Sequence, residues 1–98
     1  ANWPTRRARA WRALLAARAI DDQAWVLGVN RVGEAEGHPH RGDTSLLDPW
    51  GEVVATLAHK PGVVLNEVDA EVVRRARAHF GFLRDRRLDL YRRLGDEE

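Results

Sequence analysis

The sequence predicts a layered α+β fold, in the order helix, strand, β-meander, helix and C-terminal arm. Two patterns lead to this expectation. An apolar stripe at helical spacing runs through residues 6–20, and a nearly continuous apolar run, "AWVLGVN", follows at 24–30. A run of that kind is typical of a strand covered on both faces. The chain therefore needs a layer on each side of this strand.

The first helix is expected to begin after Pro4, with Thr5 as a candidate N-cap. Its apolar stripe consists of Trp11, Leu14, Leu15 and Ile20. Residues 31–43 contain three glycines, a proline and mixed charges, so we expect a surface loop there.

The middle of the chain predicts a β-meander. Strand residues at 44–47 precede "DPWG" at 48–51, a turn signal because Pro presets φ at the second position and Gly suits the fourth. The remaining elements expected here are a returning strand at 53–57, a turn at 59–62 and a third strand at 63–68.

The C-terminal third predicts a second helix and an arm. Asp69 is placed to cap a helix over residues 70–80. We expect His79 to bind a backbone carbonyl at the end of this helix. The stretch that follows predicts an extended or partly helical arm. We assign residues 1–93 to one domain portion and residues 94–98 to an acidic disordered tail.

Composition limits the function classes. The chain has 98 residues, 44% hydrophobic and 32% charged, which is typical of one small globular domain. No apolar run approaches the roughly 20 residues that a membrane span requires. The absence of cysteine excludes disulfides and a thiol nucleophile within these residues. A net charge of +1 predicts no strong attraction to nucleic acid.

Several residue groups have alternative interpretations. Arginines cluster at residues 6–12 and 74–77, which is compatible with a nucleic-acid-binding surface but is more typical of charged helix faces. His38 and His40 flank a proline and offer only a weak metal-site pattern, so we expect no metal there. "RGD" at 41–43 matches a cell-adhesion tripeptide, which we attribute to chance.

The helix stripe is too apolar to remain uncovered. Leaving its large side chains in water would forgo about 1.5–3 kcal/mol for each. The two expected helices are unable to cover both faces of the strand at 24–30. The chain therefore lacks a partner layer, or it is an independent interaction or oligomerisation module with this face as its binding surface.

Three longer segments resemble a known family. They are "WRALLAARAIDDQAWVLGVNRVG" at 11–33, "RGDTSLLDPWGEVVA" at 41–55 and "VDAEVVRRARAHFGFLRDRRLDLY" at 68–91, and "ANWP" precedes them at 1–4. Together they resemble the C-terminal half of the nitrilase, or carbon-nitrogen hydrolase, superfamily, and its omega-amidase-like branch in particular. One departure is Asp22, where members of the family usually have Asn.

The resemblance implies one part of a four-layer α-β-β-α sandwich. It also implies an amidase that converts a small non-peptide amide to a carboxylate and ammonia through a cysteine thioester. The family's catalytic Glu, Lys and Cys precede the residues present here, so no catalytic residue is expected in this chain, and no cofactor. Lys60 lies in a turn and does not suit the role of the catalytic Lys. These residues alone should be inactive.

The same resemblance implies partners and a binding region. The missing N-terminal half is the expected partner, with homo-oligomers formed through helix packing and the C-terminal arm, in the cytoplasm. Residues 1–5 are expected at the rim of the active site, with Asn2, Trp3 and Thr5 as the substrate-binding residues. The alternative for Trp3 is simple packing under the first helix.

Overall fold

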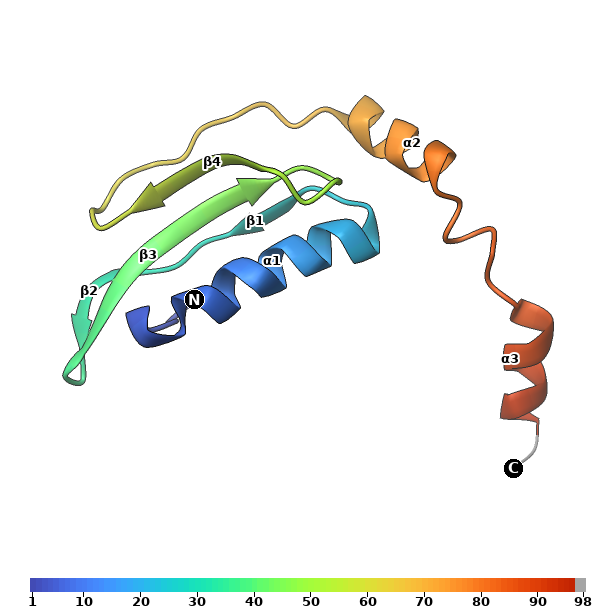
Figure 1. Ribbon diagram of the computed structural model, residues 1–98, viewed down its shortest axis with the longest axis horizontal. Helices are drawn as coiled ribbons and strands as arrows, with labels where there is room; N and C mark the ends of the chain where they lie inside the picture. Colours follow the sequence, from blue (N-terminus) through green and yellow to red (C-terminus); the bar gives the residue numbers. More distant parts are fainter. Residues whose placement is uncertain (97–98) are drawn as a thin grey trace.

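Helix α1 lies along one face of an antiparallel sheet in the computed structural model, which describes residues 1–96 (Figure 1). The α+β class predicted from the sequence is confirmed. The elements in chain order are the 3-10 helix η1 Thr5–Arg7, α1 Ala8–Asp22, β1 Val26–Gly28, β2 Val32–Ala35, β3 His38–Leu47, β4 Val53–Ala58, α2 Ala70–His79 and α3 Leu88–Gly95.

Strand β3 organises the sheet. Its C-terminal half pairs antiparallel with β1, where Val26 lies opposite Leu47, and with β4, where Ser45 lies opposite Thr56. Its N-terminal half pairs with β2, with Val32 opposite Arg41. The strand predicted at 24–30 therefore exists but is shorter, and it pairs along one edge of β3.

Helix α1 packs closely on β1 and β3. Trp11 and Ala19 of this helix are buried. Gly28 permits this approach, because a Cβ atom there would lie 2.7 Å from both methyl carbons of Leu15. Leu14 and Ile20, which belong to the predicted stripe, are instead exposed. The stripe is thus buried only where β1 and β3 lie beneath it.

The prediction of a surface loop at 31–43 is wrong. Strand β2 and the first half of β3 form a hairpin whose two loop residues, Glu36 and Gly37, have φ values of 52° and 77°. Two consecutive positive φ values are typical of the type I′ turn that joins tight hairpins. The hairpin strands are largely exposed and are therefore rich in polar residues and glycine. The sequence there lacks the apolar pattern from which a strand is predicted.

The strand predicted at 63–68 is also absent. Residues 61–69 adopt no regular secondary structure, although Val63, Val64, Leu65 and Val68 favour strands. A strand needs a neighbour for its backbone groups, and no backbone hydrogen bond joins this segment to the sheet within residues 1–96. The reason for the difference is the lack of a partner strand.

Two of the predicted local signals, the Asp69 cap and the "DPWG" turn, are confirmed, and the predicted Thr5 cap is wrong. The Asp69 side chain accepts a 2.8 Å hydrogen bond from the Glu71 N–H, which confirms the predicted cap. The "DPWG" turn is confirmed by the hydrogen bond that the Gly51 N–H donates to the Asp48 carbonyl. Thr5 is not a cap. Pro4 occupies the N-cap position of η1 without a side-chain hydrogen bond, because Thr5 already lies inside that short helix.

The C-terminal ends of α1 and α2 cap each other. The Gln23 side-chain amide donates to the carbonyls of Ala76 and Phe80, at 3.3 and 2.8 Å. In return, the Arg77 guanidinium donates to the carbonyls of Gln23 and Asp22, at 3.3 and 3.4 Å. The prediction that His79 binds a carbonyl at this helix end is wrong for the described residues, because Gln23 binds the carbonyls there. The His79 ring packs edge-on against Phe80.

Helix α3 stands away from the sheet, at the end of the arm that begins with α2 (Figure 1). The principal extents of the molecule are 50 × 37 × 16 Å, so it is flat and elongated. Helix α3 ends at Gly95, within the stretch expected to be an acidic tail, whereas Glu97 and Glu98 lie outside the described residues.

Candidate functional site

A β-bulge in β3 directs Asp43 toward α1. Gly42 pairs with Ala58 and Thr44 pairs with Leu57, so the intervening Asp43 has no partner residue on β4. Its φ is 56°, in the left-handed region that Asp and Asn enter more readily than most residues. The bulge places the carboxylate between β3 and α1, where the side chain is 7% exposed.

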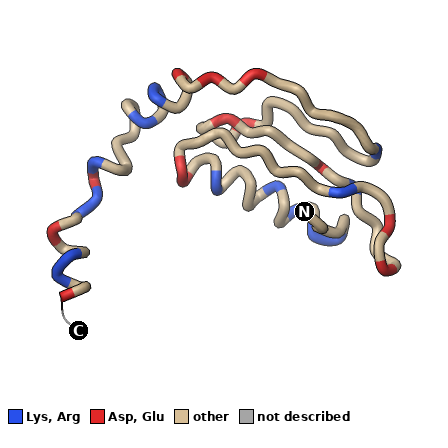
Figure 2. Tube along the Cα trace, turned by 180° about the vertical axis from the view of Figure 1, so that it is seen from behind, with Lys and Arg blue, Asp and Glu red and all other residues tan. Residues whose placement is uncertain are grey.

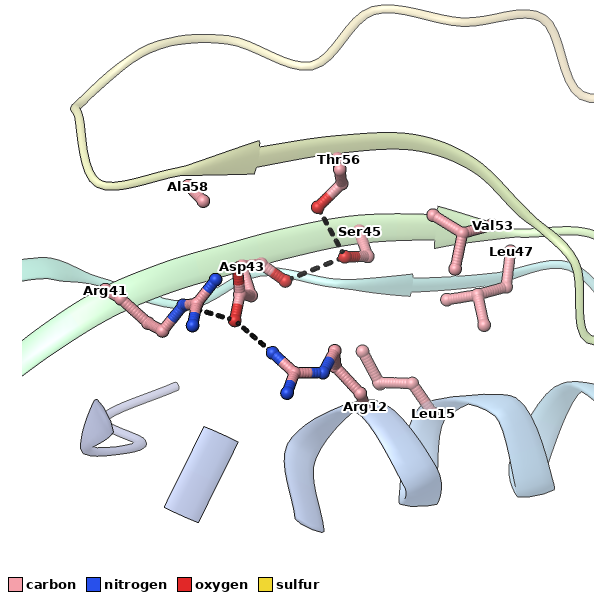
Figure 3. A pocket seen from close by; sticks show the side chains of 9 residues that line it. All are labelled: Arg12, Leu15, Arg41, Asp43, Ser45, Leu47, Val53, Thr56 and Ala58. Carbon is pink, nitrogen blue, oxygen red and sulfur yellow. Dashed lines mark hydrogen bonds and ion pairs between the residues drawn. The ribbon is translucent and has the colours of Figure 1, made fainter. Parts of the chain in front are cut away.

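Two arginines flank this carboxylate (Figure 3). Arg12 NH1, from α1, lies 3.3 Å from Asp43 Oδ2 and makes a hydrogen bond to it. Arg41 Nε lies 2.9 Å from the same oxygen, but its N–H is not aligned on it, so this contact is an ion pair without a hydrogen bond. One buried carboxylate thus faces two cations, which leaves a local excess of positive charge.

The charged group closes one end of a pocket of about 310 Å³ between α1, β3 and β4. Its polar wall also includes the hydroxyls of Ser45 and Thr56, which lie 3.0 Å apart. Its apolar wall consists of Leu15, Leu47, Val53 and Ala58 (Figure 3). Such a lining suits a ligand or side chain that is mostly apolar and carries one acceptor or negative group.

The pocket is equipped for binding and not for nucleophilic attack. The Ser45 hydroxyl donates to the Asp43 carbonyl at 2.8 Å and contacts Thr56. An activated serine needs a base such as histidine within hydrogen-bond reach, and neither of these two contacts is with such a base. The Trp11 indole N–H donates to the same Asp43 carbonyl at 2.8 Å, which ties the bulge to α1.

Asn30 holds the N-terminal segment against β3. Its Oδ1 accepts from the Trp3 N–H at 2.9 Å, and its Nδ2 donates to the Trp3 carbonyl at 3.0 Å and to the Gly42 carbonyl at 2.8 Å. Its own N–H donates to the Thr44 hydroxyl. One side-chain amide thus fixes both backbone groups of Trp3 beside the bulge. The Ala1 backbone nitrogen donates to the Val29 carbonyl at 2.7 Å and supports the same attachment.

The Trp3 side chain packs against Arg7 of η1 and Trp11 of α1. Its ring lies 5.8 Å from the Trp11 ring, centroid to centroid, and the Arg7 guanidinium sits 4.4 Å over its face. Its indole N–H donates to the Arg7 carbonyl at 2.6 Å. The backbone position of Trp3 is therefore strongly constrained.

The other two residues predicted for substrate binding are placed differently. Asn2 is exposed, and Thr5 lies partly buried in η1. Asn30 makes its contacts to this region through Trp3 and not through Asn2 or Thr5. The structure thus places the three residues on one short segment and anchors the segment at Trp3.

Comparison with known proteins supplies the family. The sequence profile of the family described as carbon-nitrogen hydrolase matches residues 2–78. The chain belongs to the carbon-nitrogen hydrolase family. Its similarity is to the omega-amidase-like branch, with 44% identity over 82 residues to omega-amidase YafV of Escherichia coli K12, covering 82% of this chain and 32% of that protein.

Two further relatives agree. The 2-oxoglutaramate amidase of Bacillus subtilis is 35% identical over 91 residues, which cover 93% of this chain and 35% of the relative. The crystal structure of XC1258, a CN-hydrolase superfamily protein from Xanthomonas campestris, superposes with a TM-score of 0.82 at 35% identity, covering 87% of this chain and 32% of that one. This carbon-nitrogen hydrolase chain spans about a third of the length of these relatives.

Many arginines of this carbon-nitrogen hydrolase chain contact other groups of the same chain. Arg7, Arg12 and Arg77 have the partners described above, and Arg74 forms an ion pair with Glu71. Figure 2 shows positive and negative residues interspersed from α2 to α3. Arginines with intramolecular partners favour the interpretation of charged helix faces over a nucleic-acid surface.

His38 and His40 lie at the start of β3. His40 is buried and its Nδ1 lies 2.9 Å from the His38 carbonyl. Within residues 1–96, no cluster of His, Cys, Asp and Glu side chains is suited to hold a metal ion. In the same part of the chain, no helix combines the length and apolar character that crossing a membrane requires.

Sequence reasoning missed the two central residues of the site. Asn30 ends the apolar run at 24–30, and a side-chain amide directly after a buried strand was the available signal. Asp43 lies in the "RGD" that was attributed to chance, and its role depends on a bulge. A bulge arises from the pairing of two strands, so the spacing of residues in the sequence did not reveal it.

Proposed function

We propose that residues 1–93 are the C-terminal portion of an amidase-type carbon-nitrogen hydrolase that converts a small non-peptide amide to a carboxylate and ammonia. The relatives named omega-amidase and 2-oxoglutaramate amidase support an amide substrate. The proposal assigns the catalytic Cys, Glu and Lys to the part of the relatives that this chain does not cover, and it is supported for the Cys by the absence of cysteine in these residues.

In the proposed reaction, a cysteine thiolate attacks the amide carbon and forms a tetrahedral oxyanion. The oxyanion collapses to a thioester as the nitrogen takes a proton and leaves as ammonia. Water then hydrolyses the thioester, which releases the carboxylate and restores the thiol. Hydrogen-bond donors positioned around the oxyanion usually make the largest contribution to lowering the barrier in reactions of this type.

The contribution of this chain is the wall of the substrate pocket formed by Asn2, Trp3 and Thr5. The observation that carries this proposal is the attachment of both Trp3 backbone groups to the Asn30 amide. A segment held in this way presents its side chains at a fixed position, which binding of a small substrate requires. Asn2 is exposed and free to meet a polar group of the substrate.

The proposal includes partners and a location. The main partner is the N-terminal half of the hydrolase, and homo-oligomers form through helix packing and the arm that ends in α3. The apolar side chains of α3 support this role, since Leu88, Tyr91 and Leu94 are exposed in the single chain. We assign the assembled enzyme to the cytoplasm.

The test is reconstitution of activity from two polypeptides. The part of E. coli YafV that precedes its matching segment is produced separately and mixed with this chain. Ammonia release from 2-oxoglutaramate is then measured for each part and for the mixture. We expect activity only in the mixture, and none when the cysteine of the YafV part is replaced by alanine.

Variants then test the proposed substrate-pocket wall formed by Asn2, Trp3 and Thr5, which is separate from the pocket beside Asp43. Trp3→Ala should raise KM or lower kcat of the mixture at least tenfold, whereas Arg75→Ala, on an exposed position of α2, should leave both unchanged. Activity of this chain alone would contradict the proposal. A mixture with Trp3→Ala that is as active as the unsubstituted mixture at every substrate concentration would also contradict it, because Trp3 would then have no part in the substrate pocket.

A further inference from the structure

The pocket beside Asp43 has the size and the walls of a small-molecule site. Its volume of about 310 Å³ lies at the lower end of the roughly 300–1,000 Å³ that such sites have. Its walls come from three elements, α1, β3 and β4 (Figure 3). A cavity of this size holds a small organic molecule, and the lining decides the chemical class of that molecule.

The charged end of the pocket carries a net positive charge. Among the lining residues, the charged side chains are Arg12, Arg41 and Asp43, two cations and one anion. Arg12 donates one N–H to Asp43, and Arg41 Nε is buried without a hydrogen-bond partner among residues 1–96. The two arginine side chains are 54% and 32% exposed, so a ligand can reach their other N–H groups. A guanidinium binds a carboxylate through paired hydrogen bonds, which indicates a carboxylate ligand at this end.

The hydroxyls of Ser45 and Thr56 offer acceptors to a ligand and no free donor. Ser45 donates its single hydroxyl proton to the Asp43 carbonyl. In the 3.0 Å contact between the two hydroxyls, Thr56 is therefore the donor. Because both protons are used within the protein, a second negative group at this point would meet only oxygen lone pairs and would be repelled. The lining thus favours a ligand with one carboxylate over a ligand with two.

The other end of the pocket is apolar and partly uncovered. Figure 3 shows Leu15, Leu47 and Val53 at the end opposite Arg41. Leu47 is 1% exposed and Val53 is 56% exposed, so this wall has a buried base and a rim in contact with water. An alkyl chain that covers the rim removes apolar surface from water, which favours binding.

We propose that the pocket beside Asp43 binds a short-chain monocarboxylate. The carboxylate binds to Arg12 and Arg41, and the alkyl chain lies against the apolar wall around Leu47 and Val53. An acidic side chain from another polypeptide carries the same chemistry, but its short stem would leave the apolar end uncovered. A free acid with a longer chain covers both ends. The binding is non-covalent and goes beyond the proposed amidase reaction, which this chain alone is not expected to perform.

An NMR titration of the nitrogen-15-labelled chain with sodium hexanoate tests the site. The Trp11 indole N–H donates to the Asp43 carbonyl, so its signal reports on the pocket. We expect this signal to shift and saturate, and the Trp25 indole signal, whose N–H donates to the Asp69 carbonyl, to stay in place. Two compounds of the same chain length are the controls. Hexanol lacks the charge and hexanedioate has a second carboxylate, and each should bind about tenfold more weakly than hexanoate.

Three substitutions test the two ends of the pocket. Arg12→Gln removes one charge at an exposed position and should weaken hexanoate binding about tenfold while leaving hexanol binding unchanged. Val53→Glu places a charge on the apolar wall and should weaken the binding of both compounds. Val54→Glu is the matched control, because Val54 is exposed on the same strand outside the pocket lining, and it should change neither affinity by more than about twofold. Circular dichroism checks that each variant keeps its fold.

The mixture with the YafV part described above separates a free ligand from a polypeptide occupant. We expect hexanoate to shift the Trp11 signal in the chain alone and in the mixture, and binding to the mixture supports the proposal. Binding to the chain alone and none to an active mixture would mean that the other polypeptide fills the pocket, which would overturn it.

Three other results would also overturn the proposal. They are an unshifted Trp11 signal in both samples, equal affinity for hexanoate and hexanol, and full hexanoate affinity of Arg12→Gln. By contrast, hexanoate binding as expected together with an inactive mixture would overturn the proposed function and leave this site intact.

Discussion

At the scale of single residues, two polar side chains decide the geometry near the N-terminus. Asn30 uses its acceptor and both donors on backbone groups that are far apart in the sequence. Asp43 occupies a bulge, and its one carboxylate lies beside arginines from α1 and β3. Such groups contribute most through the cost of leaving their partners unsatisfied.

Replacing Asn30 by alanine should detach the segment that contains Trp3. The Trp3 N–H and the carbonyls of Trp3 and Gly42 lose their partner, which should cost about 1–3 kcal/mol of unfolding free energy. Urea denaturation followed by circular dichroism measures this. Asn66→Ala is the matched control, because that amide contacts only the adjacent backbone, and it should change stability by less than about 0.5 kcal/mol.

Replacing Asp43 by asparagine should isolate the effect of its charge. Asn tolerates the left-handed φ of 56°, so the bulge itself is preserved. Arg12 and Arg41 then face each other without a carboxylate. Because both reach solvent in part, we expect a loss of about 1–3 kcal/mol, below the roughly 3–5 kcal/mol that breaking a fully buried pair costs. An equal loss for Asp85→Asn, an exposed position in the arm, would contradict this explanation.

At the scale of elements, contacts between helix ends orient α2 against α1. The amide of Gln23 and the guanidinium of Arg77 each satisfy carbonyls at the C-terminus of the other helix. Carbonyls at a helix end need partners, and two helices that supply each other's partners are held at a defined junction. Trp50 adds an aromatic contact, with its ring 5.9 Å from that of Phe80.

A double-mutant cycle measures this junction. Gln23→Ala and Arg77→Ala should each destabilise the chain by about 1 kcal/mol. Because both belong to one network, the double mutant should lose less than the sum, by about 0.5 kcal/mol or more. Additive losses in thermal unfolding would mean that the two caps act independently.

Helix α3 should respond to acid through its first turn. Arg87 donates to the Asp89 carboxylate, and this hydrogen bond lowers the pKa of Asp89 below its usual value. A group whose pKa is lowered on folding stabilises the folded state above its unfolded pKa and loses that effect as pH falls through the folded pKa. Helicity of α3 should therefore decrease on acidification. An NMR titration of Asp89 that gives a pKa at or above the ordinary value would contradict this.

At the scale of the whole molecule, the chain is more open than a domain of its length. The radius of gyration is 17.5 Å, compared with about 13 Å for a compact domain of 100 residues. Large apolar side chains are exposed along the sheet and the arm. A folded unit of this shape gains stability by burying these faces against further polypeptide.

The single chain should therefore behave as an incomplete domain. We expect strong binding of the dye ANS, a broad thermal transition and a radius of gyration near 17.5 Å in X-ray scattering. Adding the YafV part should reduce ANS fluorescence and sharpen the transition. A sharp monomeric transition without ANS binding would instead favour an independent interaction module.

The sequence by itself determined the features that depend on neighbouring residues. The first helix, the "DPWG" turn, the Asp69 cap and the α+β class follow from local periodicity and turn chemistry, and the family followed from the order of motifs. The domain boundaries and the substrate role of Asn2, Trp3 and Thr5 stay predictions.

Only the tertiary structure decided the features that depend on strand pairing. The β2–β3 hairpin is polar because it is exposed, so its sequence resembles a loop until the ladder is seen. The bulge at Asp43 exists because β4 pairs around that residue. Conversely, 63–68 has the composition of a strand but lacks a partner in this chain. A strand's backbone hydrogen bonds are made to another segment, so strand propensity is local but strand formation is not.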